Sequence, residues 1–329
     1  MRTVWRPTLL YAAAHFAVDF GCAYTALAHG NGSAFGFLIY NFCAFALQMP
    51  LGLLADRLNR NRILAAGGGF LVAAMCCVPS FGLWGMILLG IGNSLFHLGG
   101  GLDVLNLSGG QAAPLGVFVS PGALGLYCGT LLGKASANPL PVVLLVALLS
   151  SAVLALCRPA ELPDNMPLKM PTFSVFPIAA ALFLVVILRS YGGMTAAFPW
   201  KAGLWSWIAV GAVVLGKTLG GFLADRLGLR LSSCLSLGAA ALFFALSDNP
   251  WFGTAALLLF NMTMPITLFA LSQAMPGCKG FSFGLLTFAL FLGFLPVYLG
   301  SGTIGSEAMI LIALLSAVLL IPCTGRVKP

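Results

Sequence analysis

One short charged stretch decides the fold: Gly52-Leu53-Leu54-Ala55-Asp56-Arg57-Leu58-Asn59-Arg60-Asn61-Arg62. It lies between two long apolar runs. A second copy follows late in the chain, Gly221-Phe222-Leu223-Ala224-Asp225-Arg226-Leu227-Gly228-Leu229-Arg230. Both copies contain a glycine, an apolar spacer, Ala-Asp-Arg-Leu and a trailing arginine. The repeat indicates that the chain consists of two equivalent halves.

The composition excludes a soluble globular protein. Of the 329 residues, 60% are hydrophobic and only 7% are charged, whereas about a quarter of the residues in soluble domains are charged. Apolar runs of about twenty residues recur along the chain, and each is long enough to cross a hydrocarbon core as a helix. We therefore expect an all-α polytopic membrane protein, because a β-barrel requires short alternating segments instead.

Turn residues and charges divide the apolar sequence into twelve expected transmembrane helices. Their ranges are 7–28, 34–54, 62–80, 81–101, 113–134, 139–157, 173–195, 202–224, 230–247, 251–274, 279–300 and 304–323. The glycine-rich stretch 99–110 is either a loop or an extension of the fourth span. A polar, proline-rich segment at 158–172 reads as a cytoplasmic linker between two six-helix bundles, residues 1–157 and 173–329.

Basic residues at the ends of the spans predict the orientation. If the N-terminus is cytoplasmic, only Lys134 and Lys201 lie outside, which the positive-inside rule strongly favours. The residues then placed inside are Arg2, Arg6, Arg57, Arg60, Arg62, Arg158, Lys169, Arg226, Arg230, Lys279, Arg326 and Lys328. We expect a plasma (inner) membrane protein with both termini in the cytoplasm. Because the basic residues are spread singly, they do not indicate a nucleic-acid surface.

The two charged turns resemble motif A of the major facilitator superfamily, Gly-x-x-x-Asp-Arg-x-Gly-Arg-Lys, and the twelve-span plan is similar to that family over the whole chain. The resemblance implies two pseudo-symmetric bundles that rock around a central site. It also implies that the turns act as gates, through Gly52, Asp56, Arg57, Arg62, Gly221, Asp225 and Arg226. An aspartate at a helix end, facing the start of a neighbouring helix, forms a charge-assisted latch. Alternatively, the arginines only fix topology.

The first span carries ionisable residues near mid-membrane. His15 and Asp19 lie four residues apart, and Tyr11 and Cys22 share their helical face. An intramembrane carboxylate beside an imidazole is suited to take up and release a proton as solvent access changes. The alternative is a satisfied interhelical hydrogen bond.

The fourth span ends with Asn93 and His97 on one face, then three glycines and Asp103. This pattern favours a site wall or gate, or else a glycine-rich helix end with a hydrogen-bonded histidine.

In the seventh span, Arg189 follows a purely apolar run. A guanidinium keeps its charge, so it requires an anion. That anion is either Asp19 or a negatively charged solute, unless the side chain extends to the outer interface. Lys217, Asn41 and Asn261 are further candidates for lining the cavity.

Several local strings are similar to the fosmidomycin-resistance branch of the superfamily. They are His15-Phe16-Ala17-Val18-Asp19, Phe96-His97, Gly116-Val117-Phe118-Val119-Ser120-Pro121-Gly122 and Leu188-Arg189-Ser190. The branch resemblance favours export. After Phe96-His97, however, the branch has Pro-Glu-Gly where this chain has Leu98-Gly99-Gly100.

These observations predict a proton-coupled secondary active transporter of a small polar or amphiphilic solute. The alternatives are uptake or facilitated exchange of a small organic anion, or a non-transporting membrane receptor with the same fold. The expected partners are the solute, protons and the lipid bilayer, and a monomer fits the sequence. No enzymatic motif or metal-ligand spacing occurs, so no enzyme, metal or cofactor is expected.

Overall fold

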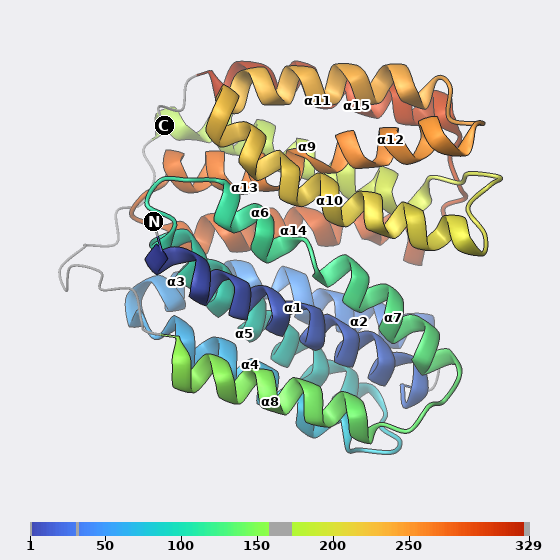
Figure 1. Ribbon diagram of the computed structural model, residues 1–329. Helices are drawn as coiled ribbons and strands as arrows, with labels where there is room; N and C mark the ends of the chain where they lie inside the picture. Colours follow the sequence, from blue (N-terminus) through green and yellow to red (C-terminus); the bar gives the residue numbers. More distant parts are fainter. Residues whose placement is uncertain (1, 31–32, 158–172, 326–329) are drawn as a thin grey trace. The chain divides into compact units, whose positions relative to one another are not determined.

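The computed structural model describes residues 2–30, 33–157 and 173–325, and these ranges are helical apart from short connections and one isolated bridge between Ala196 and Ile304 (Figure 1). The predicted linker at 158–172 lies outside the described residues, as do Arg326 and Lys328.

Within the described residues, the helices form twelve consecutive rods, each overlapping one expected span. They are α1 (Arg2–Ala28); α2, η1 and α3 (Ala34–Asn41, Phe42–Ala46, Gln48–Leu58); α4 (Asn61–Cys76); α5 (Leu83–Leu107); α6 and α7 (Ala113–Val119, Gly122–Lys134); α8 (Leu140–Leu156); η2 and α9 (Phe173–Val175, Phe176–Thr195); α10 (Leu204–Leu227); α11 (Leu229–Phe244); α12 and α13 (Pro250–Asn261, Thr263–Ala274); α14 (Lys279–Tyr298); and α15 (Ser306–Thr324).

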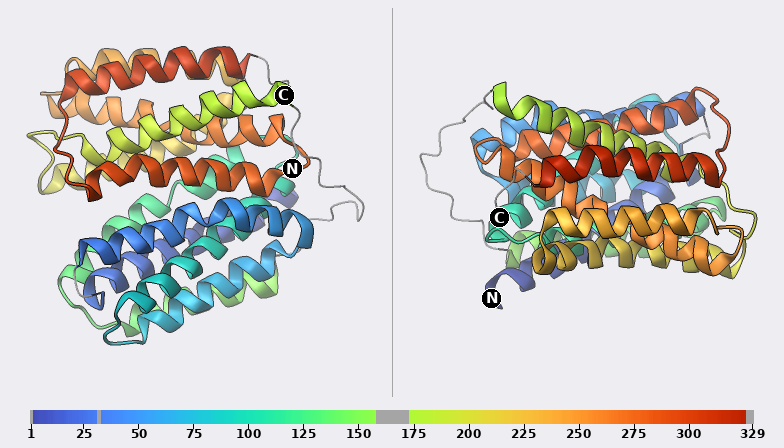
Figure 2. Two further views of the ribbon diagram at one scale, coloured as in Figure 1. Left: turned by 180° about the vertical axis from the view of Figure 1, so that it is seen from behind. Right: turned by 90° about the horizontal axis from the view of Figure 1, so that it is seen from above.

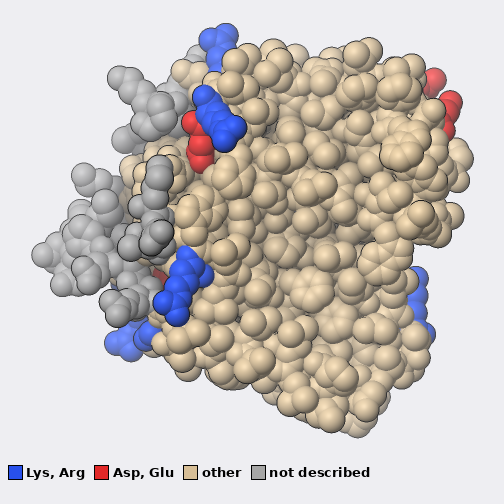
Figure 3. Space-filling view, in the orientation of Figure 1, with Lys and Arg blue, Asp and Glu red and all other residues tan. Residues whose placement is uncertain are grey.

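The helices have the length and composition of membrane spans. Among the described residues, eight rods are long and apolar enough to cross a membrane, and α4, α8 and α11 are shorter apolar helices. The visible surface carries few charged side chains, and these lie towards the helix ends (Figure 3). The expectation of an all-helical integral membrane protein is confirmed. That all twelve rods cross the membrane as two six-helix bundles stays a prediction.

The fourth rod is longer than expected. Helix α5 runs unbroken through Gly99, Gly100 and Gly101 to Leu107, so the stretch 99–110 is mostly a helix extension, and the predicted end at residue 101 is wrong. Glycine disfavours helix, but here it is compensated by packing, since a side chain on Gly99 would collide with the backbone of α4. The extension places Asp103 inside a helix.

The chain divides into two compact units by its packing. Unit 1 comprises 1–109, 121–169 and 277–288, and unit 2 comprises 110–120, 170–276 and 289–329. Helix α6 therefore belongs to unit 2 and α7 to unit 1, while α14 begins in unit 1 and ends in unit 2.

In unit 1, helix α1 packs against α4, α5, α7 and α8 (Figures 1 and 2). Its contact with α7 runs along Gly125, Gly129 and Gly133, where an added Cβ would touch a backbone oxygen of α1. The facing oxygens belong to Phe16, Phe20 and Tyr24. Such a glycine ridge lets two membrane helices approach closely, and it holds α1 in a fixed register.

In unit 2, α11 packs against α15 and α12, and α10 packs against α6, α12 and α13. Helices α11 and α15 run side by side (Figure 2). Helix α9 packs against α13 and α15, and this contact positions Arg189.

Candidate functional site

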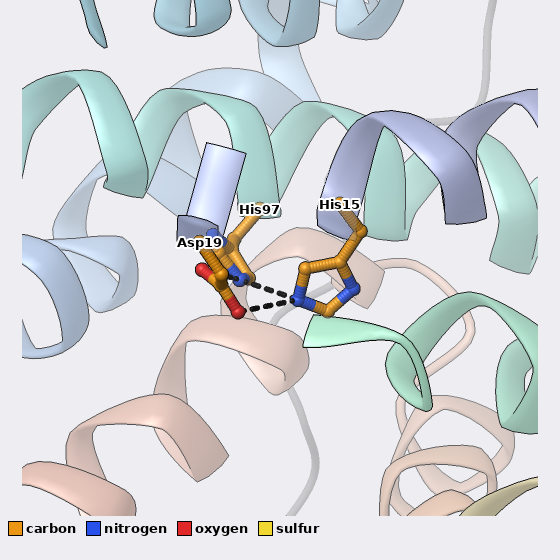
Figure 4. A group of neighbouring side chains, drawn as sticks. All are labelled: His15, Asp19 and His97. Atoms are coloured by element: carbon orange, nitrogen blue, oxygen red, sulfur yellow. Dashed lines mark hydrogen bonds and ion pairs between the residues drawn. The ribbon is translucent and has the colours of Figure 1, made fainter. Parts of the chain in front are cut away.

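A carboxylate and two imidazoles meet in the interior of unit 1 (Figure 4). His15 and Asp19 come from α1 and His97 from α5. His15 Nε2 lies 3.2 Å from Asp19 Oδ2, and His97 Nε2 lies 3.4 Å from Asp19 Oδ1. The two Nε2 atoms are 2.8 Å apart. Both histidines are buried. The three side chains are held together by the packing of α1 against α5 and against the glycine face of α7.

The hydrogen bonds define where the protons lie. His97 Nδ1 is 3.0 Å from the backbone oxygen of Asn93. That oxygen only accepts, so His97 Nδ1 carries a hydrogen. In neutral His97 the Nε2 atom is then an acceptor, and His15 Nε2 donates to it. A further proton on His97 Nε2 reverses this bond or directs it to Asp19 Oδ1, so the cluster has a defined place for an added proton.

Asn93 extends the cluster. Its Nδ2 donates to Asp19 Oδ1 at 3.2 Å and to Cys22 Sγ at 3.4 Å. Its Oδ1 is buried and has no hydrogen-bond partner among the described residues. The predicted polar face of α1 and the predicted pair on α5 therefore come together.

Gly122, the first residue of α7, packs directly against the side chains of His15 and Asp19. An added Cβ there would collide with Asp19 Oδ2 and His15 Nε2. In the sequence, Gly122 stands out only as the last residue of the string 116–122 that is similar to the fosmidomycin-resistance branch, because nothing in its local pattern shows what faces it.

The spacing of His15, Asp19 and His97 is that of a hydrogen-bonded cluster. The ligand atoms of His15, Asp19 and His97 lie within 4.8 Å of one another, close enough for one ion. Around a tetrahedral zinc ion, however, ligand atoms are about 3.4 Å apart, because Zn–N bonds are about 2.0–2.1 Å. The 2.8 Å separation of the imidazole nitrogens is a hydrogen-bond distance, so the geometry shown fits a shared proton.

A second buried carboxylate lies further along α5. Asp103 is about 9 Å beyond His97 at the helical rise, and it accepts a hydrogen bond of 2.5 Å from the Tyr11 hydroxyl. Both side chains are almost fully buried. Tyr11, His15 and Asp19 follow one another at one-turn spacing on α1, so the Asp103 carboxylate of α5 contacts the same face of α1 that carries Asp19.

The first charged turn caps a helix distant in sequence. The Asp56 carboxylate accepts hydrogen bonds from the backbone N–H groups of Gly280 and Phe281, at 2.7 and 2.9 Å. These donors in the first turn of α14 have no partner within their own helix, and the carboxylate faces the positive end of its dipole. Gly52 is required because a Cβ there would collide with the backbone of Gly280.

The second charged turn makes the equivalent contact within unit 2. Asp225 accepts from the N–H groups of Ala112 and Ala113 at the start of α6, at 2.7 and 2.9 Å. An added Cβ on Gly221 would lie 2.7 Å from the Ala112 oxygen. Both predicted latches therefore have the same construction.

The turns themselves also correspond. Asn59 ends α3 in the left-handed conformation with φ of 46°, and Gly228 follows α10 with φ of 80°. Asparagine tolerates this region better than other side chains, so Asn59 replaces the usual glycine and the chain still turns sharply.

The arginines of the turns do not pair with the aspartates. Arg57 and Arg226 are exposed, and Arg62 donates to the backbone oxygen of Cys157 at 3.0 Å. The aspartates are held by backbone N–H groups instead, and the gating role of the arginines stays a prediction.

Arg189 is 7% exposed within unit 2. Its Nη1 donates to Thr267 Oγ1 on α13 at 3.3 Å. Among the described residues no carboxylate pairs with it.

The other residues expected to line a cavity bond to backbone oxygens. Asn41 and Asn261 each donate to the carbonyl oxygen four residues earlier at 2.8 Å, and Lys217 donates to Val119 O at 3.4 Å.

Comparisons with known proteins identify the fold. No family model matches the chain, and no curated protein sequence matches it. A solved structure of the major facilitator superfamily transporter FucP, in the outward conformation, matches with a TM-score of 0.69, 14% identity and 100% coverage of both chains. A variant of the E. coli fucose:proton symporter FucP matches with a TM-score of 0.63, 14% identity and 100% coverage of both chains.

A bacterial homologue of the iron transporter ferroportin, in an outward-facing state, also matches, with a TM-score of 0.55, 16% identity and coverage of 98% of this chain and 97% of that one. The chain therefore has the fold of major facilitator superfamily transporters, and the predicted resemblance to that fold is confirmed.

Proposed function

We propose that this protein is a secondary active transporter that moves a small polar or amphiphilic solute by alternating access, coupled to protons. The proposal is carried by the Asp19 carboxylate, which is held between His15 and His97 inside a membrane helix bundle. Ionisable groups at this depth are costly to bury and are functional by default. The fold shared with a fucose:proton symporter supports the same class of function.

The proton reaches the cluster along α1. Asp103 on α5 accepts a hydrogen bond from Tyr11, which lies one turn before His15 on α1. His15 in turn contacts Asp19, which lies one turn after it. Small rearrangements of these side chains connect the two carboxylates, since each step spans about one helical turn.

Asp56 and Asp225 act as latches on the cytoplasmic side. Each holds the start of another helix by two charge-assisted hydrogen bonds, which form and break without a change of covalent structure.

The positive-inside pattern supports an inner-membrane location with cytoplasmic termini. The resemblance to the fosmidomycin-resistance branch supports export as the direction of transport.

The test is made in two stages. A thermal-unfolding screen of the purified protein against a solute library first identifies a stabilising solute. Proteoliposomes loaded with a pH-sensitive dye then report proton movement when that solute is added. We expect Asp19→Asn to bind the solute and to abolish the proton signal, whereas the exposed Asp248→Asn retains it. An unchanged proton signal in Asp19→Asn would overturn proton coupling. Uptake of the radiolabelled solute into the same proteoliposomes is measured alongside, and absence of solute flux in the wild type would overturn transport.

A further inference from the structure

The two halves of the sequence place Arg189 in the position that Asp19 occupies in the first half. The latch residues define the repeat: Asp225 follows Asp56 by 169 positions (225 minus 56), and Gly280 follows Ala112 by 168 (280 minus 112). An offset of about 170 positions therefore relates residues of unit 1 to the corresponding residues of unit 2.

Arg189 follows Asp19 by 170 positions (189 minus 19), and Thr267 follows His97 by 170 (267 minus 97). The Arg189–Thr267 hydrogen bond in unit 2 is therefore the counterpart of the Asp19–His97 contact in unit 1. One half of the repeat presents a carboxylate at this position and the other a guanidinium.

The Arg189 guanidinium is poorly satisfied for a buried cation. It has five N–H donors in a planar fork, and among the described residues its hydrogen-bond partner is the Thr267 hydroxyl. That hydroxyl donates in turn to the Met264 backbone oxygen at 2.9 Å, so it is fixed as the acceptor for Arg189. Burial of an unpaired charge is unfavourable, and 7% of the residue remains accessible.

We propose that Arg189, positioned by Thr267, binds an oxyanion of the solute, a carboxylate or phosphate-type group. The inference rests on the proposed transport function and names the class of its substrate. The planar fork is suited to two parallel hydrogen bonds to such a group. Lysine at this position would supply the charge without the fork.

The test measures binding to the purified full-length protein by thermal unfolding, with acetate, inorganic phosphate and methylphosphonate as probes and chloride at matched ionic strength as the baseline. At least one probe raises the unfolding midpoint of the wild type. The apparent affinity falls about tenfold or more in Arg189→Gln, falls less in Arg189→Lys and Thr267→Val, and is unchanged in the exposed control Arg6→Gln. Equal stabilisation of Arg189→Gln and wild type, or no response of the wild type to any probe, overturns the proposal.

A second measurement needs no variant, in case Arg189→Gln does not fold. Phenylglyoxal modifies accessible guanidinium groups, and mass spectrometry locates the adducts. The stabilising probe slows modification at Arg189 and leaves Arg6 unaffected; equal rates with and without the probe overturn the site. If anionic phosphatidylglycerol nanodiscs protect Arg189 but the free probes do not, the ligand is a lipid headgroup and the solute assignment is overturned.

The outcomes separate this site from the transport proposal. A protein that binds the probe through Arg189 and moves no solute fails only as a transporter. A protein whose solute flux and probe binding both survive Arg189→Gln remains a transporter and loses this oxyanion site.

Discussion

The Nε2 atoms of His15 and His97 lie 2.8 Å apart, although 82 residues separate them in the chain. At this distance one nitrogen donates and the other accepts, so the pair holds a proton between two helices. Asp19 contacts both imidazoles and provides the negative charge that stabilises an additional proton. We therefore expect the protonation of His15 and Asp19 on α1 to depend on the position of His97 on α5.

His97→Gln tests this relationship. Glutamine keeps a hydrogen-bonding group but does not take up a proton near neutral pH. We expect solute-driven proton flux in proteoliposomes to fall by at least about tenfold and its pH profile to flatten. His29 lies outside the cluster, and His29→Gln serves as the control with a normal profile. A normal pH profile in His97→Gln would contradict a protonating role.

Gly122→Ala tests the close packing around the cluster. The new methyl group would collide with Asp19 Oδ2 and His15 Nε2, and such overpacking costs about 1–3 kcal/mol. We expect a lower unfolding temperature and loss of proton flux. Gly67 on α4 has open space around it, so Gly67→Ala is expected to be neutral or stabilising by up to about 1 kcal/mol. Similar behaviour of the two variants would show that the site tolerates displacement.

Tyr11→Phe separates the proton route from simple stability. The change leaves the buried Asp103 carboxylate without its tyrosine donor, which costs about 1–3 kcal/mol, and we expect proton flux to fall. Tyr24 donates to the Ala137 backbone oxygen away from the cluster. Tyr24→Phe is therefore expected to lose comparable stability while retaining flux. Equal flux in both variants would exclude Tyr11 from the route.

Asp56→Asn tests the first latch through the neighbouring Cys278. Burial, with the Asp56 charge, raises the pKa of the Cys278 thiol, so less reactive thiolate is present at neutral pH and maleimide labelling is slow. Removing the charge weakens two hydrogen bonds to α14 and lowers that pKa. We therefore expect labelling at Cys278, mapped by mass spectrometry, to become at least about threefold faster. Labelling at buried Cys323 stays constant, and an unchanged rate at Cys278 would argue against a latch.

Chelation tests the distinction between a shared proton and a metal ion. Because the imidazole nitrogens are at hydrogen-bond distance, we expect dialysis against EDTA to leave the unfolding temperature unchanged. A structural or resident metal ion would stabilise the protein in proportion to its affinity. Loss of stability on chelation, restored by zinc but not in Asp19→Asn, would therefore replace the proton assignment.

Much of the fold follows from composition and periodicity. Apolar length predicts a membrane helix because the bilayer leaves the backbone no other partner for its hydrogen bonds. The close contact of α7 with α1 follows a similarly local rule, since Gly125, Gly129 and Gly133 recur at about one-turn spacing and small residues on one face let two membrane helices approach closely. The stretch 99–110 stayed open between a loop and an extension of the fourth span, because the helix preference of glycine is weak and packing against α4 decides it.

The candidate site was predicted residue by residue but not as an arrangement. His15 and Asp19 share a face of one helix, so their spacing alone brings them together. Their contact with His97 and the position of Gly122 beneath them depend on how α5 and α7 pack against α1. Local sequence carries no information about such pairings, because they join segments far apart in the chain.

The sequence by itself determined that this is a helical membrane protein, and it contains two copies of one charged turn, with an aspartate in each, and sparse charges within the apolar segments. Burial energetics and one-turn spacing suffice for those conclusions, since both act locally along the chain. Tertiary structure alone decided what each charge contacts. Asp56 caps α14, Asp225 caps α6, Asp19 joins two histidines, and Arg189 meets Thr267. The reason is that hydrogen bonds act over about 3 Å, and only the packing of distant helices brings these atoms within that range.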